Sequence, residues 1–536
     1  KRGTPSSAPV AGTESFLIGA MYDSSAPANP KNYFDGFIDE VRVWNVALTL
    51  QQIREMMNQE IQMNGTAVKG KIIPKDISGG CLWTNLKGYY SMNDGTATDL
   101  SSNGINGIPK NICLSQAQTA PMPYMASATG GDWTSAGSWL HGNVWDIENI
   151  ATNNDWNIIK LSSNVTASHN VKTYGLIIDS GVTFTLHGES LLENTRYLEL
   201  NGAIDLKDDS QLVQTNTSDL VTSATGKILR RQEGASSAFW YNYWASPVGT
   251  TGATSLIDNN AAATNNPNNT AFKLNMLKNE SGINMQFTPA YNQVDKISTY
   301  WLYTFKNGLT YWDWALLSPT ASLTPGIGYT QKGTGNAGLH QQYIFEGKPN
   351  NGTILVDVID KGGNGSVPAV SKTEYLLGNP YPSALDIYKF IDDNASVIDG
   401  TLQLWQQWAG NSHYLDEYKG GYAQVNKLGT VRASQFVGLS GATTGGLEGT
   451  LLPTKFLPVG QGFIVEIKAS GTVKFNNSQR VFIKEADADG SYGNGSTFFK
   501  NGNSKSKGAE TSSAAQDSLV FQKIRLEFNS VTGPET

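Results

Sequence analysis

Two stretches in the C-terminal half of this chain repeat the same unusual peptides in the same order. In the first, Tyr241-Asn-Tyr-Trp-Ala-Ser-Pro247 precedes Thr324-Pro-Gly-Ile-Gly-Tyr329; in the second, Tyr375-Leu-Leu-Gly-Asn-Pro380 precedes Leu457-Pro-Val-Gly-Gln-Gly-Phe463. Pro380 lies 133 positions after Pro247, and Pro458 lies 133 positions after Pro325. An equal offset at two separate anchors indicates a duplicated β unit. A copied scaffold favours display or binding over a single catalytic centre.

The composition predicts many short strands joined by tight turns. The chain has 536 residues, 56 of them glycine, and only 16% are charged, so several β domains fit within it. The net charge of −7 comes without a basic block, which argues against nucleic acid as a partner. No stretch approaches the roughly 18 apolar residues that a membrane-spanning helix needs. We therefore expect an all-β, multidomain chain that does not span a membrane.

Residues 126–230 form a separate region, in which short apolar strands are expected at intervals of about 8 to 15 residues. Gly175–Leu186 and Tyr197–Leu206 look like successive rungs of a parallel β-solenoid. A plain β-sandwich is the alternative for this segment. The repeated unit then predicts two jelly-roll-like β-sandwiches, copy one over residues 231–365 and copy two over 366–484. Residues 485–516 are low in complexity and predict a linker or mobile loop, and residues 517–536 begin a further β element.

The N-terminal 125 residues carry a more specific pattern. Phe34-Asp-Gly-Phe-Ile-Asp-Glu-Val-Arg-Val-Trp44 ends in a half-buried strand, and Thr49 with Gln52 predicts a helix that begins with a capping box. This signature resembles the end of a laminin-G-like, concanavalin-A-type jelly roll, which implies that residues 1–125 are its C-terminal part. Leu86–Asn93 is expected to complete that domain. The chain itself is expected to be a piece of a larger, processed protein.

Most of the remaining chain resembles the stalk-like part of large Bacteroidetes surface proteins. The resemblance rests on Gly137–Asp146, Leu229–Glu233, Tyr241–Gly249 and Leu377–Ser383. It implies a secreted or cell-surface location and export by the type IX secretion machinery. Asp517-Ser-Leu519 fits the O-glycosylation pattern of such exported proteins, with Ser518 as the acceptor.

No catalytic or metal-ligand motif stands out. The five histidines share no ligand spacing, and neither His-Glu-x-x-His nor Gly-x-Ser-x-Gly occurs, so we expect no enzymatic activity in this fragment. No cofactor is expected, with calcium left open. Jelly rolls of the resembling type often bind calcium, which makes Asp39 and Glu40 candidates. Asp487 and Asp489 look like half of an EF-hand loop, but the twelfth position is Phe498 rather than the glutamate this loop requires. Cys81 and Cys113 could form a disulfide or remain two buried thiols.

The aromatic residues of the repeated unit are the best candidates for ligand contacts. Exposed aromatic rings stack on sugars, whereas alternating aromatic residues are equally what a sandwich core requires. The candidates are Trp312, Trp314, Trp405, Trp408 and Tyr414. The leading hypothesis is a non-catalytic adhesin or scaffold segment that acts by multivalent display towards a surface glycan or protein. The alternatives are carbohydrate-binding modules of a surface glycan-degrading enzyme and a spacer region of a type IX secretion cargo.

Overall fold

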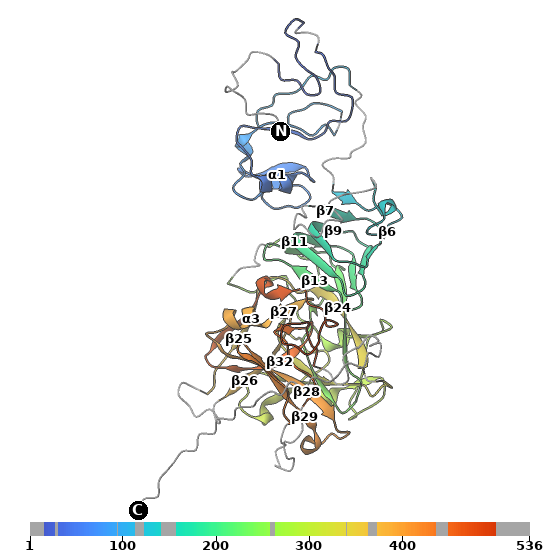
Figure 1. Ribbon diagram of the computed structural model, residues 1–536, viewed down its shortest axis with the longest axis vertical. Helices are drawn as coiled ribbons and strands as arrows, with labels where there is room; N and C mark the ends of the chain where they lie inside the picture. The colour runs from blue at the N-terminus through green and yellow to red at the C-terminus, as the bar shows by residue number, and fades with distance from the viewer. Residues whose placement is uncertain are drawn as a thin grey trace, which may run out of the picture. The chain divides into compact units, whose positions relative to one another are not determined.

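Sheets dominate the fold of this protein, as the sequence predicts (Figure 1). A computed structural model describes the chain over nine stretches: residues 15–26, 30–93, 95–112, 123–140, 157–257, 263–338, 340–362, 372–435 and 449–499. All of them belong to one compact unit, residues 1–502. The segments predicted as the end of a linker and a further β element, residues 500–536 with Ser518, lie outside the described residues.

The N-terminal region has two small antiparallel sheets and one helix. β1 (Val41–Trp44) pairs with β4 (Leu86–Tyr90), and β2 (Ile61–Asn64) pairs with β3 (Ala67–Gly70). The β1–β4 pairing is the one expected if the later strand completes the first domain. Helix α1 (Leu50–Met56) starts with the predicted capping box between Thr49 and Gln52, which satisfies two backbone groups at the helix N-terminus.

The next region is a parallel β-solenoid, which confirms that prediction over the sandwich alternative. β7 (Ile158–Leu161), β9 (Val171–Ile178), β11 (Leu191–Leu200) and β13 (Gln211–Gln214) are stacked in chain order, as Figure 1 shows. β14 (Asp219–Thr222) extends the same wall, and β5 (Tyr124–Met125) pairs at its other end. The opposite wall contains β6 (Gly131–Asp132), β8 (Val165–Ala167), β10 (Thr183–Leu186), β12 (Ala203–Leu206) and β15 (Lys227–Ala235).

Aligned side chains fill the interior between the two walls. The register places one fully buried apolar residue per rung directly over the next: Val165, Phe184, Ile204 and Ile228. Each rung therefore buries its apolar face only against its neighbours, as in other repeat folds.

β15 joins the solenoid to copy one of the repeated unit. It runs parallel to β12 of the solenoid and antiparallel to β24 (His340–Pro349). A single sheet therefore continues from β6 through β15 and β24 to β17 (Val248–Gly249). The boundary predicted after residue 230 falls inside β15, so no hinge separates the two regions at that point.

The two copies share one strand order. Copy one has a sheet in the order β16 (Tyr241–Trp244), β23 (Tyr329–Lys332), β21 (Tyr303–Phe305) and β22 (Trp314–Leu316). Copy two repeats this order with β26 (Thr373–Gly378), β32 (Gly462–Ile467), β28 (Ile398–Ala409) and β29 (Lys419–Asn426), and then adds β30 (Gly429–Val431). The second sheets also correspond, because β15 pairs with β24 as β25 (Ile354–Val358) pairs with β33 (Gly471–Phe475).

The register shows that the correspondence extends to single residues. Trp244 lies opposite Tyr329 in copy one, and Leu377 lies opposite Phe463 in copy two. The one extra residue in copy two is accommodated in the Pro-Gly turn, where Gly326 and Gly460 have φ angles of 88° and 73°. Only glycine adopts such angles without strain.

The copies contact each other reciprocally through these turns. Ala245 N–H of copy one donates to Gly460 O of copy two at 2.8 Å, and the equivalent Gly378 N–H of copy two donates to Gly326 O at 3.1 Å. Bridges between Trp244 and Gln461 and between Ile327 and Leu377 repeat the same relation. Such contacts are those of a two-fold interface in a homodimer, here built within one chain.

The sequence also predicts aromatic strands at Thr310–Trp314 and at His413–Tyr414, and both predictions are wrong in detail. Thr310 begins a 3₁₀ turn (Tyr311–Asp313) rather than a strand, and β22 starts only at Trp314. His413 and Tyr414 precede another 3₁₀ turn (Leu415–Glu417), and the strand follows as β29. These aromatic residues lie in turns next to the sheet. Their pattern in the sequence looks the same as that of aromatic residues within a strand.

The segment predicted as a linker or mobile loop from residue 485 is anchored at its described end, near residue 499. Phe498 and Phe499 are buried, and the Phe498 ring lies 4.9 Å from that of Trp244 in copy one. Phe499 N–H donates to Gln461 Oε1 of copy two at 2.7 Å. Residues 484–499, here called the strap, therefore contact both copies, although their small polar residues resemble those of a linker.

Candidate functional site

The five predicted ligand-binding aromatic residues are divided by the structure between core and surface. Trp405 is buried, at 5% exposure. Trp314 and Trp408 are partly buried and pack against core clusters. Trp312 and Tyr414 are 80% and 73% exposed, so only these two of the five are available to a ligand in full.

The buried members hold copies one and two together. Tyr243 of copy one stacks on Trp405 of copy two at 6.1 Å and 13°, and the Tyr243 and Tyr422 hydroxyls lie 2.7 Å apart. Burial raises the pKa of both tyrosines well above the usual value, so this hydroxyl pair is neutral at physiological pH. Trp405 is therefore a core residue at the contact between the two copies.

A buried lysine lies beside this cluster. Lys332 on β23 is 2% exposed, and its Nζ lies 3.8 Å from the ring centroid of Trp301, 4.5 Å from that of Tyr241 and 4.9 Å from that of Tyr418. Nζ also donates to Tyr418 Oη at 2.8 Å. Burial lowers the pKa of Lys332 to about 7, while the ring faces favour the charged form.

His413 of copy two closes the cage around this amine. Its Nδ1 lies 3.1 Å from Lys332 Nζ, and its ring stacks on Trp301 at 4.6 Å and 17°. Burial, followed by the charge of Lys332, lowers the pKa of His413 to about 4. A neutral imidazole can therefore accept a hydrogen bond from the amine. Nothing in the sequence pairs these residues, which lie 81 positions apart.

Exposed aromatic rings of copy one surround the cage; we call Tyr291, Tyr300, Tyr311 and Trp312 the aromatic band. Tyr291 and Tyr300 are 56% and 44% exposed, and their ring centroids lie 4.5 Å apart in an edge-to-face arrangement. Tyr311 is 44% exposed and contacts Trp312 at 5.5 Å. Tyr300 comes just before β21 and Tyr311 comes just before β22, and these two strands pair antiparallel, so both pairs of rings flank the same two strands.

Three of the four carboxylates proposed as metal ligands, Asp39, Glu40 and Asp489, already have protein partners. Glu40 Oε2 accepts from Arg42 Nη2 at 2.5 Å, and Glu40 Oε1 accepts from Tyr89 Oη at 3.0 Å. Burial raises the pKa of Glu40 and of Asp39, whose Oδ1 accepts from Glu40 N–H. Asp489 accepts from Ser491 and Asn494, which lowers its pKa to about 2. Within the described ranges, no three His, Cys, Asp or Glu side chains form a group able to hold a metal ion.

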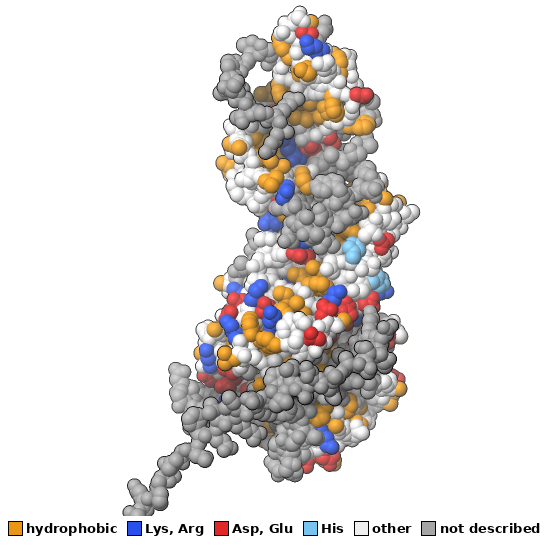
Figure 2. Space-filling model, viewed as in Figure 1, with side chains coloured by type: hydrophobic (Ala, Val, Ile, Leu, Met, Phe, Trp, Pro, Cys, Tyr) orange, Lys and Arg blue, Asp and Glu red, His pale blue; other side chains and the backbone are white. Residues whose placement is uncertain are grey.

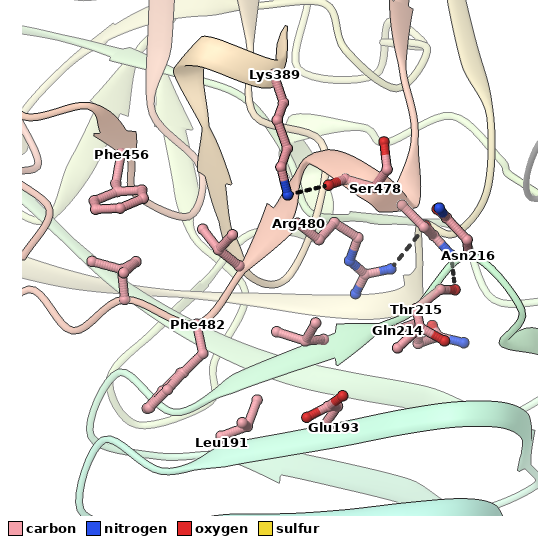
Figure 3. A pocket seen from close by; sticks show the side chains of 14 residues that line it. Leu191, Glu193, Gln214, Thr215, Asn216, Lys389, Phe456, Ser478, Arg480 and Phe482 are labelled. Atoms are coloured by element: carbon pink, nitrogen blue, oxygen red, sulfur yellow. Dashed lines mark hydrogen bonds between the residues drawn. The ribbon is translucent and has the colours of Figure 1, made fainter. Parts of the chain in front are cut away.

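A groove between the solenoid and copy two is a second candidate site (Figure 3). Its volume is 620 Å³, and its walls include Leu191 and Glu193 of β11, Lys389 of helix α3 (Ile387–Asp393) and Phe456. Arg480 lines it as well, but its guanidinium donates to Leu212 O at 2.7 Å and to Asn351 Oδ1 at 3.1 Å. These bonds join the solenoid to both copies, so Arg480 acts here as a structural link.

The cysteine prediction stays open. Cys81 is a buried free cysteine in the core of the N-terminal region, and burial raises the pKa of its thiol. Its possible partner Cys113 lies outside the described residues. No helix in the described part of the chain is long and apolar enough to cross a membrane.

Comparison with known proteins places this architecture in a family. Residues 127–515, which include the solenoid, both copies and the strap, match the model of a domain of unknown function, DUF8693. The chain belongs to the DUF8693 family. The match begins where the solenoid begins and runs beyond the strap, which agrees with the shared sheet and the reciprocal turns described above. No curated protein and no solved structure matches this DUF8693 chain.

Proposed function

We propose that this DUF8693 chain is a non-catalytic scaffold segment of a secreted or cell-surface protein, and that it acts by presenting binding surfaces on a rigid β array. The observation that carries the proposal is the single sheet that continues from β6 of the solenoid into β24 of copy one. A continuous sheet holds surfaces at fixed positions, which lets several weak contacts combine into a strong attachment.

The junctions within the described chain support the role of a rigid scaffold. Arg480 connects the solenoid to both copies, and the strap packs against both copies. Domains joined by flexible linkers would instead move independently. On the face drawn in Figure 2, acidic and basic side chains are interspersed, which suits a surface protein better than a nucleic-acid binder.

The location and the export route rest on the resemblance to Bacteroidetes surface proteins. Under this proposal the type IX secretion machinery is a transient partner, and the lasting partner is a surface glycan or protein. A spacer role in a secretion cargo uses the same rigid architecture but requires no ligand.

A second candidate function is a set of carbohydrate-binding modules attached to a surface glycan-degrading enzyme. It is favoured by the exposure of Trp312 and Tyr414, since an exposed ring can stack on a sugar face. Calcium binding by Asp39, Glu40 or Asp489 would require these carboxylates to give up their present partners.

The experiment has two arms. In the source organism, deletion of residues 127–499 should abolish surface attachment of the parent protein or binding of its partner; an unchanged phenotype would contradict the scaffold proposal. The purified chain is also applied to a glycan array with calcium and with EDTA. Selective binding would favour the carbohydrate module, and its loss in EDTA would identify calcium as a ligand. A chain that binds no glycan and whose deletion affects only export would be a spacer.

A further inference from the structure

We infer that the aromatic band of copy one is a binding site for an extended, electrically neutral polysaccharide chain. This inference deepens the proposed carbohydrate-binding function and rests on it. The ligand contacts are then mainly Tyr291, Tyr300 and Tyr311, which are not among the residues predicted from the sequence, together with Trp312, which is.

The Tyr291 and Tyr300 rings of the band are held in place before any ligand arrives. Trp301 Nε1 donates to Tyr291 O at 2.7 Å, which fixes the loop that carries the Tyr291 ring. Trp301 in turn contacts Tyr300 at 4.7 Å and lies against Lys332 and His413. Preorganised rings lose little conformational entropy on binding. The Lys332 cage is therefore interpreted as the support of the band rather than as part of the contact surface.

The arrangement of the rings favours a chain of sugars over a single sugar. The Tyr291–Tyr300 pair lies before β21 and the Tyr311–Trp312 pair lies before β22, and these two strands pair antiparallel with each other. Each exposed ring can stack on one sugar face by burying its apolar C–H groups. Two pairs of exposed rings that flank the same two strands can thus engage more than one sugar unit, so the binding energy should increase with chain length.

The charges around the band favour a neutral ligand. The segments that carry or adjoin the rings, residues 290–295, 305–316 and 410–419, contain two exposed lysines and four exposed carboxylates: Asp295, Asp313, Asp416 and Glu417. A polysaccharide with carboxylate or sulfate groups would meet this net negative charge, and like charges repel. Exposed Asn292, whose side chain also contacts His413 Nε2 at 3.4 Å, can hydrogen-bond to hydroxyl groups.

The test is titration of the purified chain with defined oligosaccharides, followed by calorimetry. The probes are cello-, xylo- and manno-oligosaccharides of two, four and six units, with polygalacturonate as the acidic probe. We expect at least one neutral series to bind, with the hexamer at least about ten-fold tighter than the dimer, unchanged in EDTA. Tyr300→Ala and Trp312→Ala should each weaken hexamer binding by about ten-fold, which corresponds to one lost ring contact.

Leu428→Ala is the matched control, because Leu428 is 98% exposed on copy two, away from the band in sequence. It should leave binding unchanged. The inference is overturned if none of the neutral hexamers binds, if polygalacturonate binds more tightly than they do, or if Tyr300→Ala and Trp312→Ala bind as well as the wild type. Failure of the scaffold proposal would be seen separately, as surface attachment that survives deletion of residues 127–499.

Discussion

Tyr329 in copy one and Phe463 in copy two occupy the same register position, and both rings are fully buried. Three residues further along the same strands, copy one has Lys332 within an aromatic cage, whereas copy two has Glu466, which pairs with Lys372 at the surface at 2.8 Å. The backbone register is therefore common to both copies while the surroundings differ. Copy one is covered at this point by Tyr418 and His413 of copy two; the equivalent part of copy two is half-exposed.

This contrast shows which residues both copies have kept since the duplication and which have diverged. The Pro-Gly turns and the glycines that follow are preserved because both copies need them for the reciprocal contact. A Cβ on Gly328 would lie 2.6 Å from Leu377 O, and a Cβ on Gly462 would lie 2.8 Å from the Tyr243 carbonyl carbon. The side chains outside this contact have diverged with their neighbours.

The largest expected difference between the copies is the pH response of Lys332. Its pKa is about 7 in the fold, against 10.5 in the unfolded chain. Between these values the unfolded state binds more protons, so stability should rise with pH, by up to about 5 kcal/mol in total. Lys332→Met should reduce this slope between pH 7 and 10, as measured by denaturant unfolding. Lys419→Met, at an exposed position, should leave it unchanged; an equal slope in Lys332→Met would refute the lowered pKa of the buried amine.

Removal of the strap's anchor should come next. Phe498 is 3% exposed and packs on Trp244, so Phe498→Ala should lower the free energy of unfolding by about 3–5 kcal/mol. Ile283→Ala, at a 61% exposed position of copy one, serves as the control and should change it little. If Phe498→Ala were as stable as this control, the strap would be a linker after all.

The reciprocal turns predict equal effects in the two copies. Gly328→Ala and Gly462→Ala each force a methyl group against the backbone of the other copy, and each should cost about 1–3 kcal/mol. Thermal unfolding of both variants measures this. Gly252→Ala, where a Cβ would meet nothing within 4 Å, provides the control. A large effect at only one of the two glycines would contradict the pseudo-symmetric interface.

The smallest effect concerns the hydroxyl that distinguishes Tyr329 from Phe463. Tyr329 Oη is buried and finds no hydrogen-bond partner among the described residues, so Tyr329→Phe should be neutral or slightly stabilising. Tyr381→Phe removes a buried hydroxyl that donates to Gly352 O at 2.7 Å and should cost about 1 kcal/mol. Chemical denaturation of both variants measures their free energies of unfolding. An equal decrease in Tyr329→Phe and Tyr381→Phe would show that the Tyr329 hydroxyl has a hydrogen-bond partner.

The local features of the fold could be predicted from the sequence. The Pro and Gly anchors identified the equivalent turns, the alternating apolar residues located the solenoid rungs, and Thr49 with Gln52 marked the start of α1. Each of these signals lies within a short window, where backbone conformation and side-chain period are directly readable.

The candidate site was less predictable because its residues meet only through tertiary packing. Lys332 and His413 come from different copies, and the band residues Tyr291 and Tyr300 come from a loop and a 3₁₀ turn rather than from strands. Trp405 is buried and Trp312 is exposed, although both are tryptophans in similar aromatic sequences. The strap was missed for the same reason, since its polar composition hides two buried phenylalanines.

Hydrogen exchange under increasing denaturant tests the central claim most directly, namely that the solenoid and the two copies form one cooperative scaffold. Amides in β9, β16 and β26 report on the three regions separately. The account predicts that all three exchange through one opening reaction with the same free energy, equal to that of global unfolding. Opening of β26 at a clearly lower free energy, while β9 and β16 stay protected, would contradict it and reduce the copies to independent domains.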